Sequence, residues 1–183
     1  MHIGLYFGTF NPVHKGHLAI VEGTYKQGLF DAVWFIVSPS SPFKIYPQWL
    51  DERKRFDLVN LAIEKLPYCL ASDIEFEMDR PSYTYLTLRK LRETEPYHTF
   101  SILMGEDNLN DIEKWKNYEE IVKNHSIYVY PRGGNSQKKE MKNVFYIDLP
   151  LLNISSSQIR ERLEKGESIE EFLPEKVFEY LNK

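Results

Sequence analysis

Short apolar segments alternate with segments of helical periodicity along most of the chain, and this alternation restricts the fold more than any other feature. Six segments have the length and the β-branched and aromatic content of strands, at residues 3–7, 32–37, 70–76, 99–104, 126–130 and 144–147. Four helical segments lie between them, at residues 17–28, 51–65, 83–92 and 109–124. Strands separated by helices join through right-handed crossovers, which produce parallel pairing. We therefore predict a doubly wound α/β fold, with a mainly parallel sheet and helices on both faces.

Length and composition fit one domain. The chain has 183 residues, of which 42% are hydrophobic, so there is enough apolar material for a sizeable core. No internal repeat is visible, and the proline- and serine-rich tract at residues 38–47 reads as a loop rather than a linker. We predict a single domain over residues 1–183, with a helical C-terminal part from about residue 154 packed on it.

Charge and cysteine content exclude several classes of function. The formal net charge is -4, so no overall positive field attracts nucleic acid or anionic lipid. Cys69 is the only cysteine, which rules out an internal disulfide and a thiolate zinc cluster. No segment approaches the ~20 apolar residues of a membrane span, and the start of the chain lacks a signal-peptide pattern. We expect a cytoplasmic protein without nucleic-acid or membrane partners, and the sequence leaves homo-oligomerisation open.

The string GTFNPVHKGHL directly follows the first predicted strand and leads into the first predicted helix. A helix N-terminus in this position offers unpaired N–H groups to an anion. Gly8 and Gly16 allow close approach of the backbone to a ligand, and His14 and His17 can each donate an imidazole N–H to a phosphate oxygen. A histidine pair at this spacing can also be a surface accident or part of a metal site, but no third metal ligand lies nearby in the sequence.

This string resembles the signature of the nucleotidyltransferase superfamily, a T/H-x-G-H motif that stands here as His14, Lys15, Gly16 and His17. The resemblance implies a Rossmann-like nucleotidyltransferase fold. It also implies that both histidines hold the ATP phosphates and stabilise a pentacoordinate transition state. Over nearly the whole chain, the spacing of further motifs is similar to that of the bacterial nicotinate-nucleotide adenylyltransferases.

Two of these motifs imply a site for the mononucleotide. RPSYTYLTL resembles the family's Ser-Tyr-Thr element, here Ser82, Tyr83 and Thr84, although Ser82 also has the position of a helix N-cap. GEDNLNDIEKW matches G-x-D-x-L followed by a tryptophan, which places Asp107 near a ribose and Trp115 against a pyridine ring. A tryptophan on an amphipathic helix is more often a core residue, but stacking on a cationic pyridine would supply about 0.5–2 kcal/mol.

A third motif, ISSSQIR, resembles the family's I-S-S-T-x-I-R element, whose serines and arginine clasp the β- and γ-phosphates of ATP. Ser155 and Gln158 have the spacing of a capping box, so a new helix is expected to begin here. Ser157 replaces the usual threonine and keeps the hydroxyl group.

Other positions match less closely. Lys44 follows the second predicted strand, where the resemblance favours ATP binding over an exposed, solvated lysine. Phe43 stands where many relatives have histidine, and Asn11 replaces the more frequent aspartate of the first motif. Arg132 is a weaker candidate for phosphate binding. Relatives often have an arginine before a proline at this place, whereas here Pro131 precedes Arg132.

The resemblance therefore implies three groups of site residues. The catalytic group is His14, His17, Lys44 and Arg160. The ATP-binding group is Gly8, Thr9, Phe10, Gly16, Gly105, Asp107, Ile154, Ser155, Ser156 and Ser157. The substrate-binding group is Tyr83, Thr84, Trp115 and Arg132, and no residue is assigned as a metal ligand.

The implied reaction joins ATP to nicotinate mononucleotide, with Mg²⁺ accompanying the ATP, and yields nicotinate adenine dinucleotide and pyrophosphate for NAD synthesis. Its nucleophile is a phosphomonoester with a second pKa of about 6, so no general base is required. No Ser-His-Asp or paired-carboxylate arrangement is apparent in the sequence. Two alternatives stay open: the same chemistry on another acceptor, such as nicotinamide mononucleotide, phosphopantetheine or a cytidylyl-transfer substrate, and a nucleotide-binding regulator without turnover.

Overall fold

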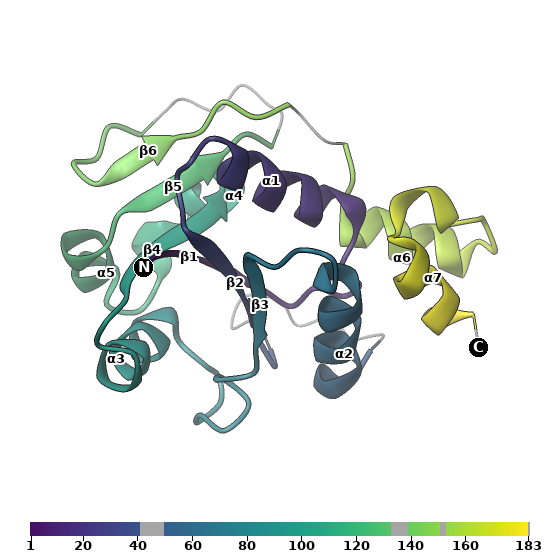
Figure 1. The fold of residues 1–183 in the computed structure, drawn as a ribbon, viewed down its shortest axis with the longest axis horizontal. Helices are drawn as coiled ribbons and strands as arrows, with labels where there is room; N and C mark the ends of the chain where they lie inside the picture. The colour runs from purple at the N-terminus through teal and green to yellow at the C-terminus, as the bar shows by residue number, and fades with distance from the viewer. Residues whose placement is uncertain (41–49, 133–138, 151–152, 183) are drawn as a thin grey trace.

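A six-stranded, all-parallel sheet forms the centre of the computed structural model, which describes residues 1–40, 50–132, 139–150 and 153–182 (Figure 1). The strand order is β3-β2-β1-β4-β5-β6, and each neighbouring pair is parallel. The strands are β1 (His2–Gly8), β2 (Ala32–Val37), β3 (Cys69–Ser72), β4 (Thr99–Gly105), β5 (Ile127–Tyr130) and β6 (Val144–Tyr146). The predicted doubly wound fold is confirmed.

Helices cover both faces of the sheet and enclose two apolar cores. The helices are α1 (Lys15–Lys26), α2 (Glu52–Ile63), α3 (Thr84–Thr94), α4 (Glu106–Asn110), α5 (Tyr118–Asn124), α6 (Ser156–Glu164) and α7 (Glu175–Leu181), with 3₁₀ turns η1 (Ile112–Lys114) and η2 (Glu170–Phe172). One core unites α1, α2, α6 and α7 with one face of the sheet, and the other unites α3, α4 and α5 with the opposite face. Successive strand residues alternate between them: Tyr6 lies in the first core and Leu5 in the second.

The chain reverses its winding direction between β1 and β4, which are neighbours at the middle of the sheet. The first half of the chain builds β2 and β3 outward from β1, and the second half builds β5 and β6 outward from β4 on the other side. In sheets of this kind, ligands bind beyond the carboxyl ends of the strands at this switch point. Gly8 ends β1 and Gly105 ends β4, so the loops that follow them flank the expected site.

The single helix predicted at residues 109–124 is wrong. The chain instead forms α4, η1 and α5 in succession. Trp115 is extended, with φ −75° and ψ 139°, and Asn117 has the left-handed conformation at φ 56°, so neither residue can continue a helix. Both Ile112 and Ile121 still reach the same apolar core. The apolar spacing was therefore compatible with broken helices as well as with a continuous one.

Most other boundaries lie within three residues of the prediction. The third strand is the larger exception, because the structure ends it at Ser72 and the chain turns before Phe76. The prediction extended it across apolar residues that pack on the core from a non-strand segment, Ile74 and Phe76 among them.

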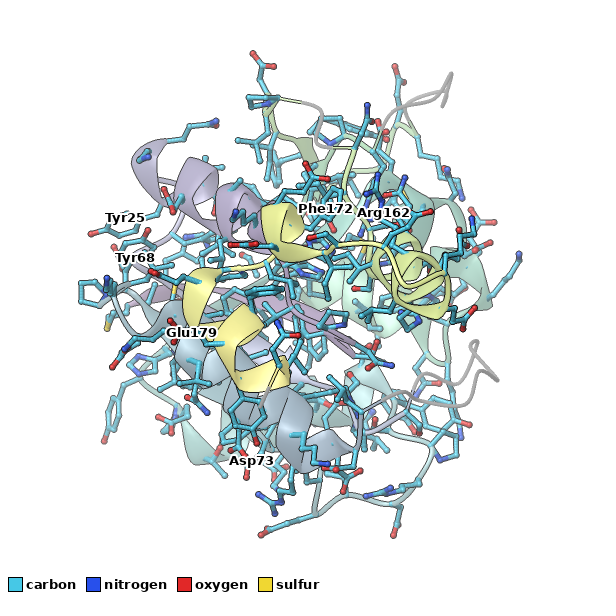
Figure 2. All side chains as sticks on the ribbon, turned by 90° about the vertical axis from the view of Figure 1, so that its right-hand side faces the viewer. Tyr25, Tyr68, Asp73, Arg162, Phe172 and Glu179 are labelled. Atoms are coloured by element: carbon cyan, nitrogen blue, oxygen red, sulfur yellow. The ribbon has the colours of Figure 1, made fainter. Side chains whose placement is uncertain are left out.

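The C-terminal helices pack against the face that carries α1 and α2. Ile159 of α6 and Val177 of α7 belong to that core, and α7 lies beside α2. Figure 2 faces this side of the molecule and shows Arg162 next to Phe172, whose ring centre lies 4.8 Å from the guanidinium carbon. In the described parts of the chain, no helix is both long and apolar enough to cross a bilayer.

Candidate active site

A cavity of about 1040 Å³ opens at the carboxyl ends of β1 and β4, large enough for two nucleotides. Its walls come from the loop after β1, the first turn of α1, the start of α3, the segment from α4 to η1, and the first turns of α6. The predicted residues that line it are Gly8, Thr9, Phe10, His14, His17, Tyr83, Thr84, Asp107, Trp115, Arg132, Ser155, Ser156, Ser157 and Arg160.

The two histidines stand at the start of α1, where sequence analysis placed them. Their rings stack with centroids 3.6 Å apart. His14 immediately precedes the helix, and its backbone N–H donates to Nδ1 of His17 at 3.2 Å. Because Nδ1 of His17 is the acceptor, the proton of the neutral ring is on Nε2. His17 therefore has an N–H donor fixed by the backbone.

Burial keeps the imidazole of His14 uncharged. The residue is 3% exposed, and this desolvation, together with the charge of Arg132, lowers the pKa of His14 to about 3. Nδ1 of His14 has no hydrogen-bond partner among the described residues. The ring also lies so close to the helix that a Cβ on Gly16 would stand 2.9 Å from Nδ1. Glycine at position 16 therefore makes room for the stacked pair.

The burial of His14 predicts a specific loss of stability in acid. Because the pKa falls from about 6.5 in the unfolded chain to about 3 in the folded one, the unfolded state binds the proton first as the pH decreases. Between pH 7 and pH 5 this single group should lower the free energy of unfolding by about 2 kcal/mol. Urea unfolding of the wild type and of His14→Gln at both pH values measures it. An equal loss in the two proteins would contradict the assignment.

The start of α6 reaches across the molecule to the loop after β1. Ser155 and Gln158 form the predicted capping box. The Ser156 hydroxyl donates to the carbonyl of Pro12 at 3.0 Å, and Nη1 of Arg160 donates to the carbonyl of Asn11 at 2.8 Å. Segments almost 150 residues apart in the sequence thus form one wall, and Arg160 lies in the same cavity as His17.

Residues at the ends of β4 and β5 form a polar corner beside the histidines. Nε of Arg132 lies 3.6 Å from a carboxylate oxygen of Asp107, and its Nη2 donates to the Tyr130 hydroxyl at 3.0 Å. The Tyr130 and Tyr6 hydroxyls are hydrogen-bonded to each other. A Cβ on Gly105 would stand 2.5 Å from Asp107 and 2.9 Å from Arg132, so a side chain here would separate this pair.

The opposite wall carries the aromatic residues that sequence analysis assigned to the mononucleotide. Tyr83 and Thr84 begin α3, and Trp115 lies half-buried just after η1. Nζ of Lys116 lies 4.6 Å from the centre of the Tyr83 ring, which puts a cation at this wall. Ser82 is not the N-cap of α3: Tyr83 has that position, and the Ser82 hydroxyl donates to Glu75 at 2.8 Å.

Three of the predicted residues that the structure describes do not line this cavity. Gly16 and Ile154 line a much smaller adjoining one, and Gly105 acts through the approach of its neighbours as described above. Lys44, together with Phe43, lies outside the described residues. Asn11 does line the cavity. Its side-chain oxygen accepts from the Leu50 backbone N–H, and the neutral amide makes this bond without the charge of the more frequent aspartate.

Sequence analysis missed two buried charged residues beneath the cavity. Glu75 is 2% exposed and contributes to the lining. Arg55 is fully buried, and its guanidinium bonds the carbonyls of Thr9 and Ser38, two residues that line the cavity. Glu75 lies outside regular structure, seven residues before Ser82, so no periodicity singled it out. Arg55 stands among charged residues of a helix, Arg53 and Lys54 before it, and therefore reads as part of a solvated face.

The donor set fits phosphate better than a protein-bound metal. In the described part of the chain, no three His, Cys, Asp or Glu side chains gather where they could hold a metal ion. The first turns of α1 and α6 instead bring together imidazoles, hydroxyls and the Arg160 guanidinium. Such groups match polyphosphate oxygens, which are themselves good ligands for Mg²⁺.

Comparison with known proteins agrees with this geometry. The family model described as cytidylyltransferase-like matches residues 5–162. A probable nicotinate-nucleotide adenylyltransferase of Flavobacterium johnsoniae is 45% identical over 100% of this chain and 96% of its own length. A similarly named protein of Bacteroides fragilis is 41% identical over 96% of this chain and 88% of its own.

The chain belongs to the nicotinate-nucleotide adenylyltransferase family. Solved structures of similar proteins have the same fold as this chain. The nicotinic acid mononucleotide adenylyltransferase of Plasmodium falciparum complexed with NaAD matches with a TM-score of 0.83 and 21% identity, over 98% of this chain and 94% of that one. A putative family member from Vibrio parahaemolyticus matches with a TM-score of 0.76 and 24% identity, over 100% and 99% of the two chains. The cavity of this adenylyltransferase family member lies where the fold predicts a ligand.

Proposed function

We propose that this protein transfers the adenylyl group of ATP to nicotinate mononucleotide. The products are nicotinate adenine dinucleotide, a precursor of NAD, and pyrophosphate. One observation carries the proposal: a single cavity joins His14, His17 and Arg160 on one side to Tyr83, Thr84 and Trp115 on the other. Membership of the nicotinate-nucleotide adenylyltransferase family supports the same reaction. A cytoplasmic location is part of the proposal, since ATP and the mononucleotide are intracellular metabolites.

ATP is assigned to the side formed by the starts of α1 and α6. Two helix N-termini point at this region, and each offers N–H groups to an anion. His17 Nε2 and the Arg160 guanidinium add donors on the same side of the cavity. In the proposed site the triphosphate lies between them. Lys44 is proposed to contribute a further charge.

The mononucleotide is assigned to the wall formed by α3 and η1. Trp115 provides a flat face for the cationic pyridine ring. The Lys116 ammonium beside Tyr83 supplies positive charge near an acidic ring substituent, which favours the acid over the uncharged amide. Arg132 is proposed to approach a phosphate, and Asp107, which belongs to the ATP-binding group, to accept hydrogen bonds from ribose hydroxyls.

Catalysis then consists of alignment and charge stabilisation. A phosphate oxygen of the mononucleotide attacks the α-phosphorus, the bond from that phosphorus to the bridging oxygen breaks, and pyrophosphate leaves with the electron pair. The attacking phosphate is mostly dianionic at neutral pH, so no side chain must remove a proton. Preorganised donors at His14, His17 and Arg160 offset the charge that builds on the transferring group. Mg²⁺ is proposed to enter with ATP and neutralise its phosphates.

The direct test is incubation with ATP, Mg²⁺ and one acceptor at a time. Nicotinate mononucleotide, nicotinamide mononucleotide and phosphopantetheine are the acceptors, and pyrophosphate release and the dinucleotide product are the readouts. The first acceptor should give the largest kcat/KM. Preference for either of the others would replace the proposed substrate, and ATP binding without pyrophosphate release from any acceptor would indicate a regulator.

Trp115→Ala should chiefly affect the mononucleotide. Loss of a stacked cation–π contact worth about 0.5–2 kcal/mol raises KM for nicotinate mononucleotide by about 2- to 30-fold, with KM for ATP nearly unchanged. Initial rates with each substrate varied in turn measure both constants. Tyr97→Ala is the control, because Tyr97 is 92% exposed and does not line the cavity. An effect on ATP alone would mean that the aromatic platform serves the other substrate.

A further inference from the structure

Arg55 is a buried charge whose acceptors are backbone carbonyls from three separate segments. Its side chain is fully buried, and burial lowers its pKa to about 10, so it is still protonated at neutral pH. Among the described residues it makes no ion pair with a carboxylate. Its four hydrogen bonds run to the carbonyls of Leu50, Thr9, Ser38 and Pro39, at 3.3, 2.5, 2.8 and 2.9 Å.

Three of these carbonyls directly follow two neighbouring strands of the sheet. Thr9 follows β1, whereas Ser38 and Pro39 follow β2. The five N–H groups of a guanidinium lie in one plane and can reach several carbonyls at once, which a lysine ammonium on a flexible chain does less well. Removing the guanidinium would take a charged donor from each of these four carbonyls. Arg55 therefore fixes the separation of the two loops.

The same contacts orient peptide units beside the cavity. In a trans peptide unit the C=O and N–H point in opposite directions. Because the Thr9 and Pro39 carbonyls face Arg55, the N–H groups of Phe10 and Ser40 face away from it. Phe10 and Ser40 both line the cavity. Arg55 thus fixes the orientation of the peptide units before two residues that line the cavity.

A second buried charge, Glu75, continues the connection from β2 to α3. Its two carboxylate oxygens accept from the hydroxyls of Ser82 and Thr87, each at 2.8 Å. The Ser38 side chain lies near the Glu75 carboxylate, where it favours the charged form and so lowers the pKa of Glu75. Burial raises the pKa of Glu75, and the three hydroxyls oppose that rise. Glu75 therefore holds the segment directly before Tyr83 and Thr84 against the loop after β2.

We propose that Arg55 and Glu75 are positioning residues that connect the two substrate sides of the cavity through Ser38, which contacts both. Arg55 holds the loop after β1, on the ATP side, and Glu75 holds the start of α3, on the mononucleotide side. The roles of the two sides rest on the function proposed above. The network keeps the two reacting phosphates at a fixed separation, which in-line transfer requires.

The test compares matched substitutions on one helix. Arg55→Lys keeps the charge but not the planar set of donors, and Arg53→Lys makes the same change at a residue whose guanidinium bonds Asp73 on the surface. We expect Arg55→Lys to weaken ATP binding at least about 5-fold by calorimetry and to lower kcat/KM for ATP about 10-fold or more. Arg53→Lys should change neither more than about 2-fold.

Glu75→Gln tests the other half of the network. It should raise KM for nicotinate mononucleotide about 10-fold and change KM for ATP much less, because its contacts lead to the start of α3. In the double variant Arg55→Lys/Glu75→Gln, the loss of kcat/KM for nicotinate mononucleotide should be at least about 3-fold smaller than the product of the losses of this constant in the two single variants, since both residues act through Ser38.

Distinct results would overturn the proposal. A merely structural role would reduce the active fraction and leave both KM values and the ATP dissociation constant unchanged, and strictly multiplicative losses in the double variant would remove the connection. If Arg55→Lys does not fold, Ser38→Ala, which removes the hydroxyl beside Glu75 and keeps the backbone carbonyl that Arg55 bonds, must still raise KM for the mononucleotide about 3-fold. The calorimetric result does not depend on turnover, so a wild type inactive on nicotinate mononucleotide would reject the proposed function without deciding the role of Arg55.

Discussion

Replacement of His17 by alanine is expected to lower kcat about 100-fold or more, with a much smaller effect on KM for nicotinate mononucleotide. The reason is preorganisation. The ring is held by the His14 backbone N–H, by stacking on the His14 ring, and by edge contacts with Phe10 and Tyr6 at centroid distances of 5.1 and 5.8 Å. A donor fixed in this way stabilises developing charge without reorganising during the reaction.

Steady-state rates of the His17→Ala and His98→Ala variants measure this effect. His98 contacts Trp34 and Phe100 and does not line the cavity, so its replacement controls for the loss of a histidine elsewhere in the fold. Turnover of His17→Ala within a few-fold of the wild type would remove His17 from the catalytic group. A large rise in KM for the mononucleotide with little change in kcat would mean that His17 binds the mononucleotide and not the ATP phosphates.

Arg160→Ala should be the second most damaging change, lowering kcat/KM for ATP about 100-fold. The guanidinium bonds the Asn11 carbonyl through Nη1 and the Ser157 hydroxyl through Nη2, at 2.8 and 3.1 Å, so its planar group is oriented before any substrate arrives. Arg160→Lys should restore only part of the loss, because a lysine ammonium lacks the forked geometry that matches phosphate oxygens.

Arg162 provides a control on the same helix. It lies over Phe172 and near Glu167 and Glu171, on the surface that faces the reader in Figure 2. Arg162→Ala should leave kcat/KM for ATP within about 2-fold of the wild type, since exposed ion pairs contribute little. Equal losses in both variants would point to a general disturbance of α6 instead of a role for Arg160 at the phosphates.

The parts of the site that sequence analysis found are those carried by short, continuous strings. The loop with His14 and His17 and the capping box at Ser155 each combine a local backbone signal with the residues that act there. The parallel topology predicts the place of the first loop, because loops after central strands lie at the carboxyl edge of the sheet. The approach of α6 to that loop follows instead from the tertiary bonds of Ser156 and Arg160, because α6 comes after the edge strand β6. The fold was predictable because the strands are apolar, short and regularly separated.

What was missed depends on contacts between distant segments. Arg55 has four acceptors in three segments, and nothing in its own helix distinguishes it from its exposed neighbour Arg53. Glu75 is defined by hydroxyls from Ser82 and Thr87. The position of Trp115 was assigned correctly to the cavity but to the wrong local structure, because the left-handed backbone at Asn117 leaves no mark in apolar periodicity.

The bond between Ser156 and Pro12 has a consequence for synthesis of the chain. Every strand of the sheet is complete by Tyr146, whereas α6, which closes the phosphate side, begins ten residues later. A polypeptide released early by the ribosome would thus contain every strand segment of the sheet and lack the α6 residues that bond the loop after β1. It would also lack Ile159 and Val177 of the core, so the last residues to be synthesised complete both the packing and the proposed phosphate side.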